Sequence, residues 1–100
     1  MAAFEIRYAP SAVAHLERLT ARKQAVVLGQ LVAQLGHEPT VESRNRKRMR
    51  PNPLASWELR LGDVRVYSDV DDDPDPVVIV LAIGLKRRER VWIGGSEFEL

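Results

Sequence analysis

The segment 57–67 constrains the fold most, because it has the pattern of two β-strands joined by a two-residue turn. It reads Trp-Glu-Leu-Arg-Leu-Gly-Asp-Val-Arg-Val-Tyr, with apolar and polar residues alternating on both sides of Gly62-Asp63. Alternation with a period of two is typical of a half-buried strand, and glycine followed by a polar residue favours a tight hairpin turn. With the turn at these two residues, the expected cross-strand pairs are Leu61–Val64, Arg60–Arg65, Leu59–Val66 and Glu58–Tyr67.

The hairpin should have one apolar face and one polar face, since successive side chains of a strand point to opposite sides. The predicted apolar face holds Trp57, Leu59, Leu61, Val64 and Val66. The predicted polar face holds Glu58, Arg60, Arg65 and Tyr67. Two neighbouring arginines repel one another unless a carboxylate or an anionic ligand lies between them. The polar face is therefore a candidate anion site, and the alternative is a surface salt-bridge network worth about 0–1 kcal/mol per pair.

Upstream of the hairpin, the pattern indicates one strand and two helices. Residues 3–8 alternate as a strand does, whereas residues 10–20 and 21–36 carry apolar residues at helical spacing. Pro10 suits the first position of a helix, where the backbone N–H has no partner within the helix. The stripe that we expect the second helix to bury is Ala25, Leu28, Leu31, Val32 and Leu35.

Downstream, residues 40–56 have no period and are predicted to form a basic loop. The segment 71–76 is rich in aspartate and proline and is expected to form a turn. Residues 77–83 form an apolar, β-branched run typical of a covered strand. A short edge strand at 91–93 and an acidic tail at 94–100 complete the chain. The expected order β-α-α-β-β-β gives an α+β fold, with a two-helix hairpin packed on one face of a mostly antiparallel four-stranded sheet. The opposite face is expected to be open to solvent.

The composition excludes several classes of site. The chain has no cysteine, which excludes disulfides, thiolate metal sites and cysteine nucleophiles. Its two histidines, His15 and His37, do not have metal-ligand spacing and are expected to be surface or capping residues. We therefore expect no metal and no cofactor. No secretory signal or apolar run of ~18 residues is visible, which predicts a single cytoplasmic domain over 1–100 without membrane contact.

Charge is distributed unevenly along the chain. The formal net charge is +1, but the five aspartates of 69–75 leave +6 on the remaining residues. Basic residues concentrate at 44–50 and at 86–90. Two such clusters in one small domain suit a polyanionic partner, although a solvated charged loop explains either cluster taken alone.

Three segments occur in an order that resembles a known family. Arg7-Tyr8-Ala9-Pro10 opens the first predicted helix, the hairpin 57–67 follows, and Ala82-Ile83-Gly84-Leu85-Lys86-Arg87 closes the last long strand. The ordered set is similar to the RelE/ParE superfamily of bacterial type II toxins, over the chain up to about Ile93. The resemblance implies a small cytoplasmic toxin that a cognate antitoxin neutralises, with operator DNA contacted only through the antitoxin.

The resemblance also implies a set of site residues. Metal-independent RNA cleavage needs a base for the 2′-OH, a cation for the phosphorane and an acid for the 5′ oxygen. Arginine suits the second task because its guanidinium is permanently charged and planar. In RelE-like ribonucleases a hairpin arginine does this work, and it maps onto Arg65. The predicted catalytic set is Arg65, Arg60, Lys86, Arg87 and Glu58, with Glu58 standing in as the base.

The predicted RNA contacts come from the two basic clusters and from two aromatic residues. They are Arg46, Lys47, Arg48, Arg50, Arg88, Arg90, Trp92 and Tyr67. The resemblance maps a base-stacking aromatic onto Trp92, for which packing at the sheet edge is the alternative. Covering the sheet is the alternative role of Tyr67.

The sequence departs from the RelE pattern at two positions. RelE-type enzymes carry lysines on the strand that enters the hairpin, whereas this chain has Ser56 and Glu58 at the matching positions. Three hypotheses therefore stay open. The first is a RelE-like ribosome-dependent mRNA endoribonuclease that inhibits translation. The second is a ParE-like inhibitor of DNA gyrase without chemistry of its own. The third is a non-toxic regulatory partner that acts only in an antitoxin complex.

Overall fold

The predicted hairpin forms the middle of the sheet. In the computed structural model, which describes residues 4–36, 42–71 and 77–98, β3 (Trp57–Leu61) pairs antiparallel with β4 (Val64–Asp71). Every predicted cross-strand pair is present. Gly62 has a φ of 62°, a left-handed conformation that glycine adopts without strain. The hairpin prediction is confirmed.

The sheet is larger than predicted. β5 (Val77–Arg87) follows β4, and β6 (Arg90–Ile93) and β7 (Ser96–Phe98) extend the sheet beyond it. β2 (Arg46–Arg48), inside the predicted loop, pairs with β3. β1 (Glu5–Tyr8) pairs with β5 in parallel, whereas all other pairs in the described part of the chain are antiparallel. The α+β class is confirmed, but the described residues form seven strands rather than four.

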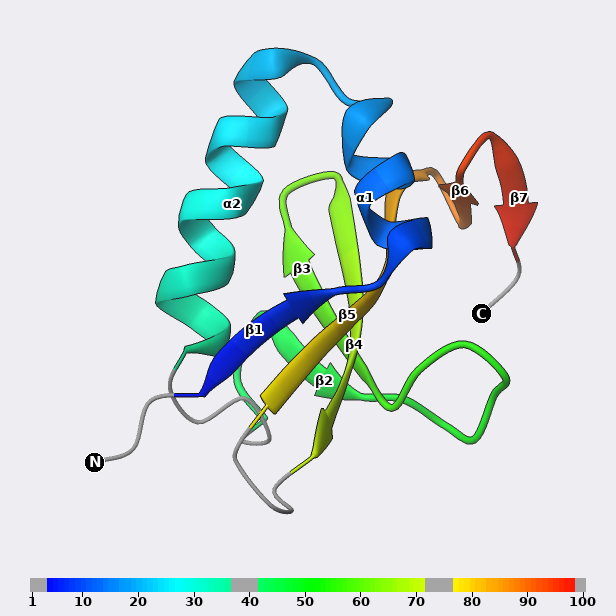
Figure 1. Cartoon of the computed structure of the whole chain (residues 1–100). Coiled ribbons are helices and arrows are strands. Elements are labelled where there is room, and N and C mark those ends of the chain that lie inside the picture. The colour runs from blue at the N-terminus through cyan, green and yellow to red at the C-terminus, as the bar shows by residue number, and fades with distance from the viewer. Residues whose placement is uncertain (1–3, 37–41, 72–76, 99–100) are drawn as a thin grey trace.

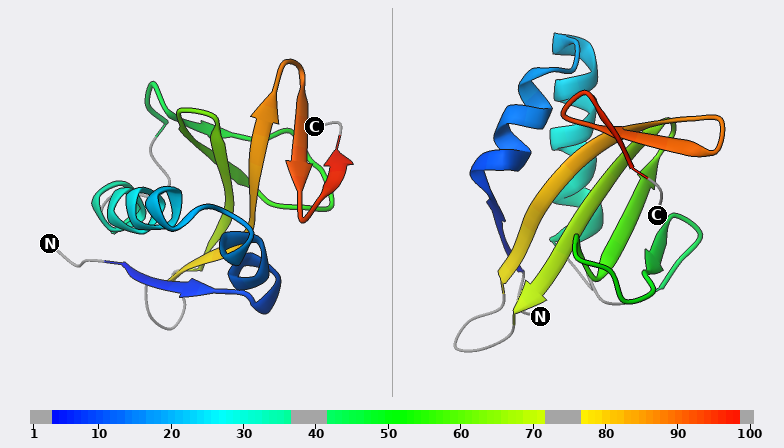
Figure 2. Two further views of the ribbon diagram at one scale, coloured as in Figure 1. Left: turned by 90° about the horizontal axis from the view of Figure 1, so that it is seen from above. Right: turned by 90° about the vertical axis from the view of Figure 1, so that its right-hand side faces the viewer.

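β5 has two neighbours along the same edge. Its residues Val77–Val80 pair with β1, and Gly84–Arg87 pair with β6. The register of β4 against β5 shifts between Tyr67 and Ser68, and such a bulge bends a strand and increases its twist. Figure 2 shows β5 as a long curved strand that runs from β1 to the β6–β7 hairpin.

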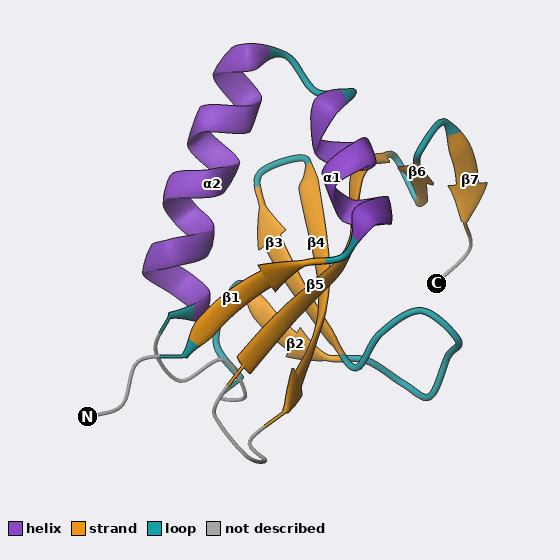
Figure 3. Cartoon of the chain, viewed as in Figure 1, coloured by secondary structure: helices purple, strands orange, loops and turns teal. Residues whose placement is uncertain are grey.

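Two helices cover one face of this sheet, as predicted (Figures 1 and 3). α1 (Pro10–Glu17) starts at the proline, and α2 (Ala21–Leu35) is capped by Thr20, whose Oγ1 accepts a hydrogen bond from the Lys23 N–H at 3.2 Å. The core between helices and sheet consists of Ala12, Leu19, Val27, Leu31, Leu35, Leu59, Val64, Val66, Val78, Val80 and Ile83. In the described residues, no helix is long and apolar enough to cross a membrane.

The buried face of α2 differs from the predicted stripe. Val27, Leu31 and Leu35 are buried, whereas Leu28 is 39% and Val32 64% exposed. The helix is apolar on two sides, so helical spacing alone cannot select the side that meets the sheet.

The sheet face away from the helices is covered at Tyr67, which corrects the expectation of an open face. Tyr67 is fully buried, and it packs in a second cluster with Ala55, Ala82, Val91 and Ile93. Loop residues before β3 and the strand β6 supply this cover. The position of Tyr67 on this face is as predicted, but its side chain is a core residue.

Asn52 holds the covering loop together. Its Nδ2 donates to the backbone oxygens of Arg50 (2.7 Å) and Ala55 (2.9 Å). Its Oδ1 accepts from the N–H groups of Leu54 (2.8 Å) and Ala55 (3.1 Å). The Asn52 side chain thereby provides hydrogen-bond partners for backbone N–H and C=O groups of the loop that are not paired in a strand.

Candidate functional site

Four of the five predicted catalytic side chains line one cavity of about 830 Å³ on the sheet face away from the helices. Glu58 and Arg60 come from β3, Arg65 from β4 and Lys86 from β5. They meet because residues two apart on a strand share a face and because Arg60 and Arg65 are direct cross-strand partners. The end of β2 and the loop after it, residues Lys47–Leu54, supply a further part of the lining.

The cavity has a strongly positive lining. Two acidic residues, Glu58 and Glu89, face six basic ones, so the lining has a formal excess of four positive charges. The basic residues are Lys47, Arg48, Arg50, Arg60, Arg65 and Lys86. A polyanion that entered would gain from each of these cations, and arginine forks match phosphate oxygens geometrically.

Glu58 and Arg60 form an ion pair, with 2.9 Å between Glu58 Oε1 and Arg60 Nε. The Glu58 side chain is only 14% exposed, whereas that of Arg60 is 47% exposed. The salt-bridge interpretation of the hairpin therefore holds for these two residues. The carboxylate is held in place by a neighbour that itself remains accessible.

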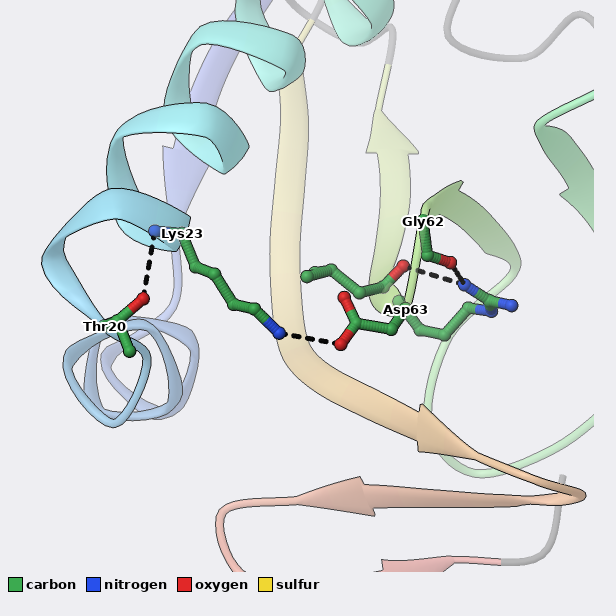
Figure 4. Close-up of polar contacts among 6 residues, drawn as sticks. Thr20, Lys23, Gly62 and Asp63 are labelled. Atoms are coloured by element: carbon green, nitrogen blue, oxygen red, sulfur yellow. Dashed lines mark hydrogen bonds and ion pairs between the residues drawn. The ribbon is translucent and has the colours of Figure 1, made fainter.

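Arg65 does not join that pair. Its Nη1 donates to the backbone oxygens of Gly62 (2.6 Å) and Val64 (3.0 Å), so the hairpin turn fixes the guanidinium (Figure 4). A cation held by its own backbone needs little reorganisation when an anion arrives, which is the condition for electrostatic stabilisation.

The turn beside Arg65 is anchored from two sides. Lys23 Nζ of α2 lies 2.7 Å from Asp63 Oδ2 (Figure 4). The Lys86 N–H donates to the Asp63 backbone oxygen at 2.7 Å. The hydrogen bond from Lys23 lowers the pKa of the Asp63 carboxyl below its ordinary value. α2 and β5 thus both position the Gly62-Asp63 turn next to the arginine.

Tyr67 lies beneath the cavity as the cross-strand partner of Glu58. Burial raises the pKa of the Tyr67 hydroxyl, and the negative charge of Glu58 raises it further. Within the described part of the chain the hydroxyl has no hydrogen-bond partner of normal geometry, so we attribute the effect of Glu58 to charge. The phenol is neutral and buried, and it is not presented to a ligand.

The basic loop is divided between two roles. Arg46 is 7% exposed and its Nη1 donates to the Gln34 backbone oxygen of α2 at 2.6 Å, so it fastens β2 to the helix layer. The Arg48 guanidinium lies 5.7 Å from the centre of the Trp57 ring, a cation–π distance, while Arg48 also lines the cavity. Lys47 and Arg50 are exposed lining residues.

The remaining predicted residues lie elsewhere. Arg87 and Trp92 line a separate cavity of about 270 Å³ on the helix side of the sheet. Arg88 is exposed in the turn between β5 and β6, and Arg90 forms an ion pair with Glu97. The structure therefore does not bring these four residues to the cavity that holds Arg65.

Sequence reasoning missed three residues that shape these sites. Asn52 lies between Pro51 and Pro53, a turn signal that could have marked it. His15 accepts a hydrogen bond from the Ile83 N–H at its Nδ1 (3.2 Å), and it lines the second cavity with Arg18. No local pattern distinguishes these last two from solvated helix residues. His37 lies outside the described residues.

No potential metal site appears in the described ranges, since no group of three or more His, Cys, Asp or Glu side chains gathers there. Cations rather than carboxylates dominate the large cavity. The arrangement can bind an anion, hold it against fixed donors and present one carboxylate beside it.

Comparison with solved structures shows a likeness in fold. No family model and no curated protein matches the chain. Among solved structures, the chain is similar to one in the toxin–antitoxin complex RelBE2 from Mycobacterium tuberculosis, with a TM-score of 0.73 and 24% sequence identity. The likeness covers 86% of this chain and 94% of that one. At this identity the likeness demonstrates a shared fold alone, and that fold agrees with the architecture that the motifs implied.

Proposed function

We propose that the chain is the toxin of a type II toxin–antitoxin pair and that it cleaves mRNA on the ribosome. The observation that carries this proposal is that Arg60, Arg65 and Lys86 line one basic cavity together with the Glu58 carboxylate. The fold supports the toxin role, since the similar solved structure comes from a toxin–antitoxin complex. A cognate antitoxin is the implied partner.

In this proposal the scissile phosphate enters the cavity beside Arg65. Glu58 takes the proton of the 2′-OH, and the 2′ oxygen forms a bond to phosphorus while the bond to the 5′ oxygen breaks. Arg65 and Arg60 stabilise the added negative charge on the phosphorane. Lys86 returns a proton to the leaving 5′ oxygen, because arginine side chains do not deprotonate. The products are a 2′,3′-cyclic phosphate and a 5′-hydroxyl end.

Cleavage of mRNA by purified ribosomes plus this protein tests the proposal, with cut sites located by primer extension. Arg65→Ala should reduce the cleavage rate by roughly 10²–10³-fold, the effect of removing one fixed donor to a developing anion. Arg22→Ala is the matched control, since it removes the same charge from an exposed position on α2. Thermal melting confirms that both variants are folded. Intact message at an excess of folded protein would reject the ribonuclease.

One observation favours the gyrase hypothesis. Where RelE-type enzymes carry a lysine this chain has Glu58, and its carboxylate is already bound in an ion pair with Arg60. A supercoiling assay with purified gyrase separates the two activities. Loss of supercoiling together with intact mRNA supports a gyrase inhibitor, and cut mRNA with unchanged supercoiling supports the ribonuclease. If cells that express the protein alone grow normally, with intact mRNA and unchanged DNA supercoiling, the protein is a regulatory partner.

A further inference from the structure

The Tyr67 hydroxyl is a buried polar group without a partner. The Tyr67 side chain is fully buried, and within residues 4–36, 42–71 and 77–98 its hydroxyl is the only buried side-chain polar atom that has no hydrogen-bond partner. Buried hydroxyls almost always have a partner, because taking one out of water without a replacement hydrogen bond destabilises the fold. An exception of this kind points to a role of the hydroxyl that the free protein does not use.

The surroundings of the hydroxyl contain one side chain that can accept its hydrogen bond. Its buried neighbours in the second cluster are all apolar, namely Ala55, Ala82, Val91 and Ile93. The charged side chains whose fields act on the phenol are Glu58, Arg60 and Arg65. Arginine side chains only donate hydrogen bonds, so the Glu58 carboxylate is the acceptor of this set.

The phenol is a hydrogen-bond donor at every physiological pH. Burial raises the pKa of the Tyr67 hydroxyl, and the negative charge of Glu58 raises it further. A hydroxyl that keeps its proton can donate to a carboxylate, but it cannot take a proton from a substrate. A role of Tyr67 in the proposed site is therefore to hold Glu58 and not to transfer a proton.

The residue that holds Glu58 in the free protein can be reached by an anion. Arg60 Nε lies 2.9 Å from Glu58 Oε1, and the Arg60 side chain is about half exposed where it lines the large cavity. The guanidinium offers a planar fork of donors that matches phosphate oxygens. A phosphate group in the cavity therefore competes with Glu58 for Arg60, and the carboxylate then needs another donor.

We infer that Tyr67 is a positioning residue for Glu58, and that its hydroxyl donates a hydrogen bond to the carboxylate when a phosphate group draws Arg60 away. The two residues are direct cross-strand partners, whose Cβ atoms lie about 4.5–5.5 Å apart in a regular pair. A rotation of side chains can therefore close the bond without a movement of the backbone. Hydrogen bonds of this kind are often absent or poorly aligned in a free enzyme and form in its substrate complex.

This exchange of donors leaves the proposed chemistry unchanged, and its consequence for catalysis rests on the proposed function. The proton of the 2′-OH still goes to Glu58, and the phenol keeps its own proton. A hydrogen bond to an ionised carboxylate favours the ionised form. Tyr67 thus keeps Glu58 oriented and able to act as a base while Arg60 contacts the phosphate.

Tyr67→Phe tests the role in cleavage, because it keeps the ring in the second cluster and removes only the hydroxyl. On ribosomes, the maximal cleavage rate should fall by roughly 10- to 150-fold, the effect of losing a hydrogen bond to a charged group. The protein concentration that gives half-maximal cleavage should change little. The low-pH limb of the rate profile should move upward by roughly one pH unit. Tyr8→Phe is the control, since it removes the other tyrosine hydroxyl of the chain, on β1, and should cleave like the wild type.

The stability of Tyr67→Phe separates a positioning role from a structural one. Because the hydroxyl has no partner in the described part of the free protein, this variant should melt at the wild-type temperature or above it. A hydroxyl that supports the fold would instead lower the melting temperature when it is removed. Either that result or cleavage by Tyr67→Phe at the wild-type rate would overturn the inference.

Nuclear magnetic resonance of the isolated protein tests the exchange of donors without any cleavage. With carbon-13 at the tyrosine Cζ, the two tyrosines give two signals, which Tyr8→Phe assigns. Saturating inorganic phosphate should shift the Tyr67 signal as the hydroxyl gains an acceptor, and the Arg60 Nε–H signal as the ion pair opens. In Glu58→Ala the Arg60 signal should still respond to phosphate, whereas the Tyr67 signal should not.

Two results of this measurement would reject the exchange. One is a Tyr67 signal that phosphate leaves unmoved in the wild type, and the other is a Tyr67 shift that persists in Glu58→Ala. A Glu58-dependent Tyr67 shift in a protein that leaves mRNA intact would retain the exchange and reject the ribonuclease.

Discussion

Gly84→Ala should destabilise the protein, because β6 lies too close to β5 at this point for an added methyl group. A Cβ on Gly84 would be 2.8 Å from Ile93 Cγ1, 2.8 Å from the Trp92 backbone oxygen and 3.0 Å from Val91 Cγ1. Ordinary contacts begin near 3.4 Å. A side chain can rotate away, but a backbone oxygen cannot, so the strand itself must move.

The expected cost is about 1–3 kcal/mol, the usual penalty for overpacking a well-packed site. In a 100-residue domain, each kcal/mol lowers the melting temperature by about 4–8 °C, so the melting temperature should fall by about 4–24 °C. Thermal melting followed by circular dichroism measures this.

Gly29→Ala provides a control with the opposite sign. Gly29 lies within α2 and a Cβ there would have nothing within 4 Å. Alanine is favoured over glycine inside a helix by about 1 kcal/mol, so this variant should melt about 4–8 °C higher. A Gly84→Ala protein that melts at the wild-type temperature would refute the close packing of β6 on β5.

Two further outcomes follow from hydrogen bonds described above. Asn52→Ala should lower the unfolding free energy by about 1–3 kcal/mol, because backbone groups of the covering loop lose their partners, and hydrogen exchange at the Leu54 amide should accelerate. An unchanged rate of hydrogen exchange at the Leu54 amide would show that Asn52 does not stabilise the loop. Asp63→Asn should cost up to about 1 kcal/mol at pH 7, since the pair with Lys23 is half exposed. The folded-state pKa of Asp63 is lowered, so its contribution is present above about pH 4 and is lost as the pH falls below that. Urea denaturation at pH 7 and at pH 2.5 checks this, and an equal difference at both pH values would contradict it.

The sequence predicted the hairpin register because two independent signals agreed there. The strand period of two and the two-residue turn specify the same register between the two strands. A register shifted by one residue would move the apolar side chains to the other face of the sheet. The same signals placed Glu58, Arg60 and Arg65 together. The structure confirms their common face.

The errors arise where long-range cover, rather than local pattern, decides burial. Tyr67 is buried by a loop without a period, which no alternation could reveal. Val27 replaces Leu28 at the core because α2 offers two apolar sides. Packing against the sheet determines which of the two apolar sides of α2 is buried.

The separation of Lys86 from Arg87 has a different origin. Both belong to one basic cluster in the sequence, and the resemblance allowed either to serve the same site. Only the extension of β5 to Arg87 shows that the two residues face opposite sides. A basic cluster that forms a strand is thus divided between two surfaces.

The parallel pairing of β1 with β5 also determines when the sheet can form during translation. Glu5 pairs with Val77, so the first strand cannot complete its hydrogen bonds until the residues of β5 have been synthesised. Contacts between such distant segments slow folding, because a long loop must close before they form. During translation, which proceeds from the N-terminus, the early helices therefore lack the sheet they cover. A protein proposed to act on translating ribosomes therefore forms this sheet only after its own ribosome has translated the segment Val77–Val80.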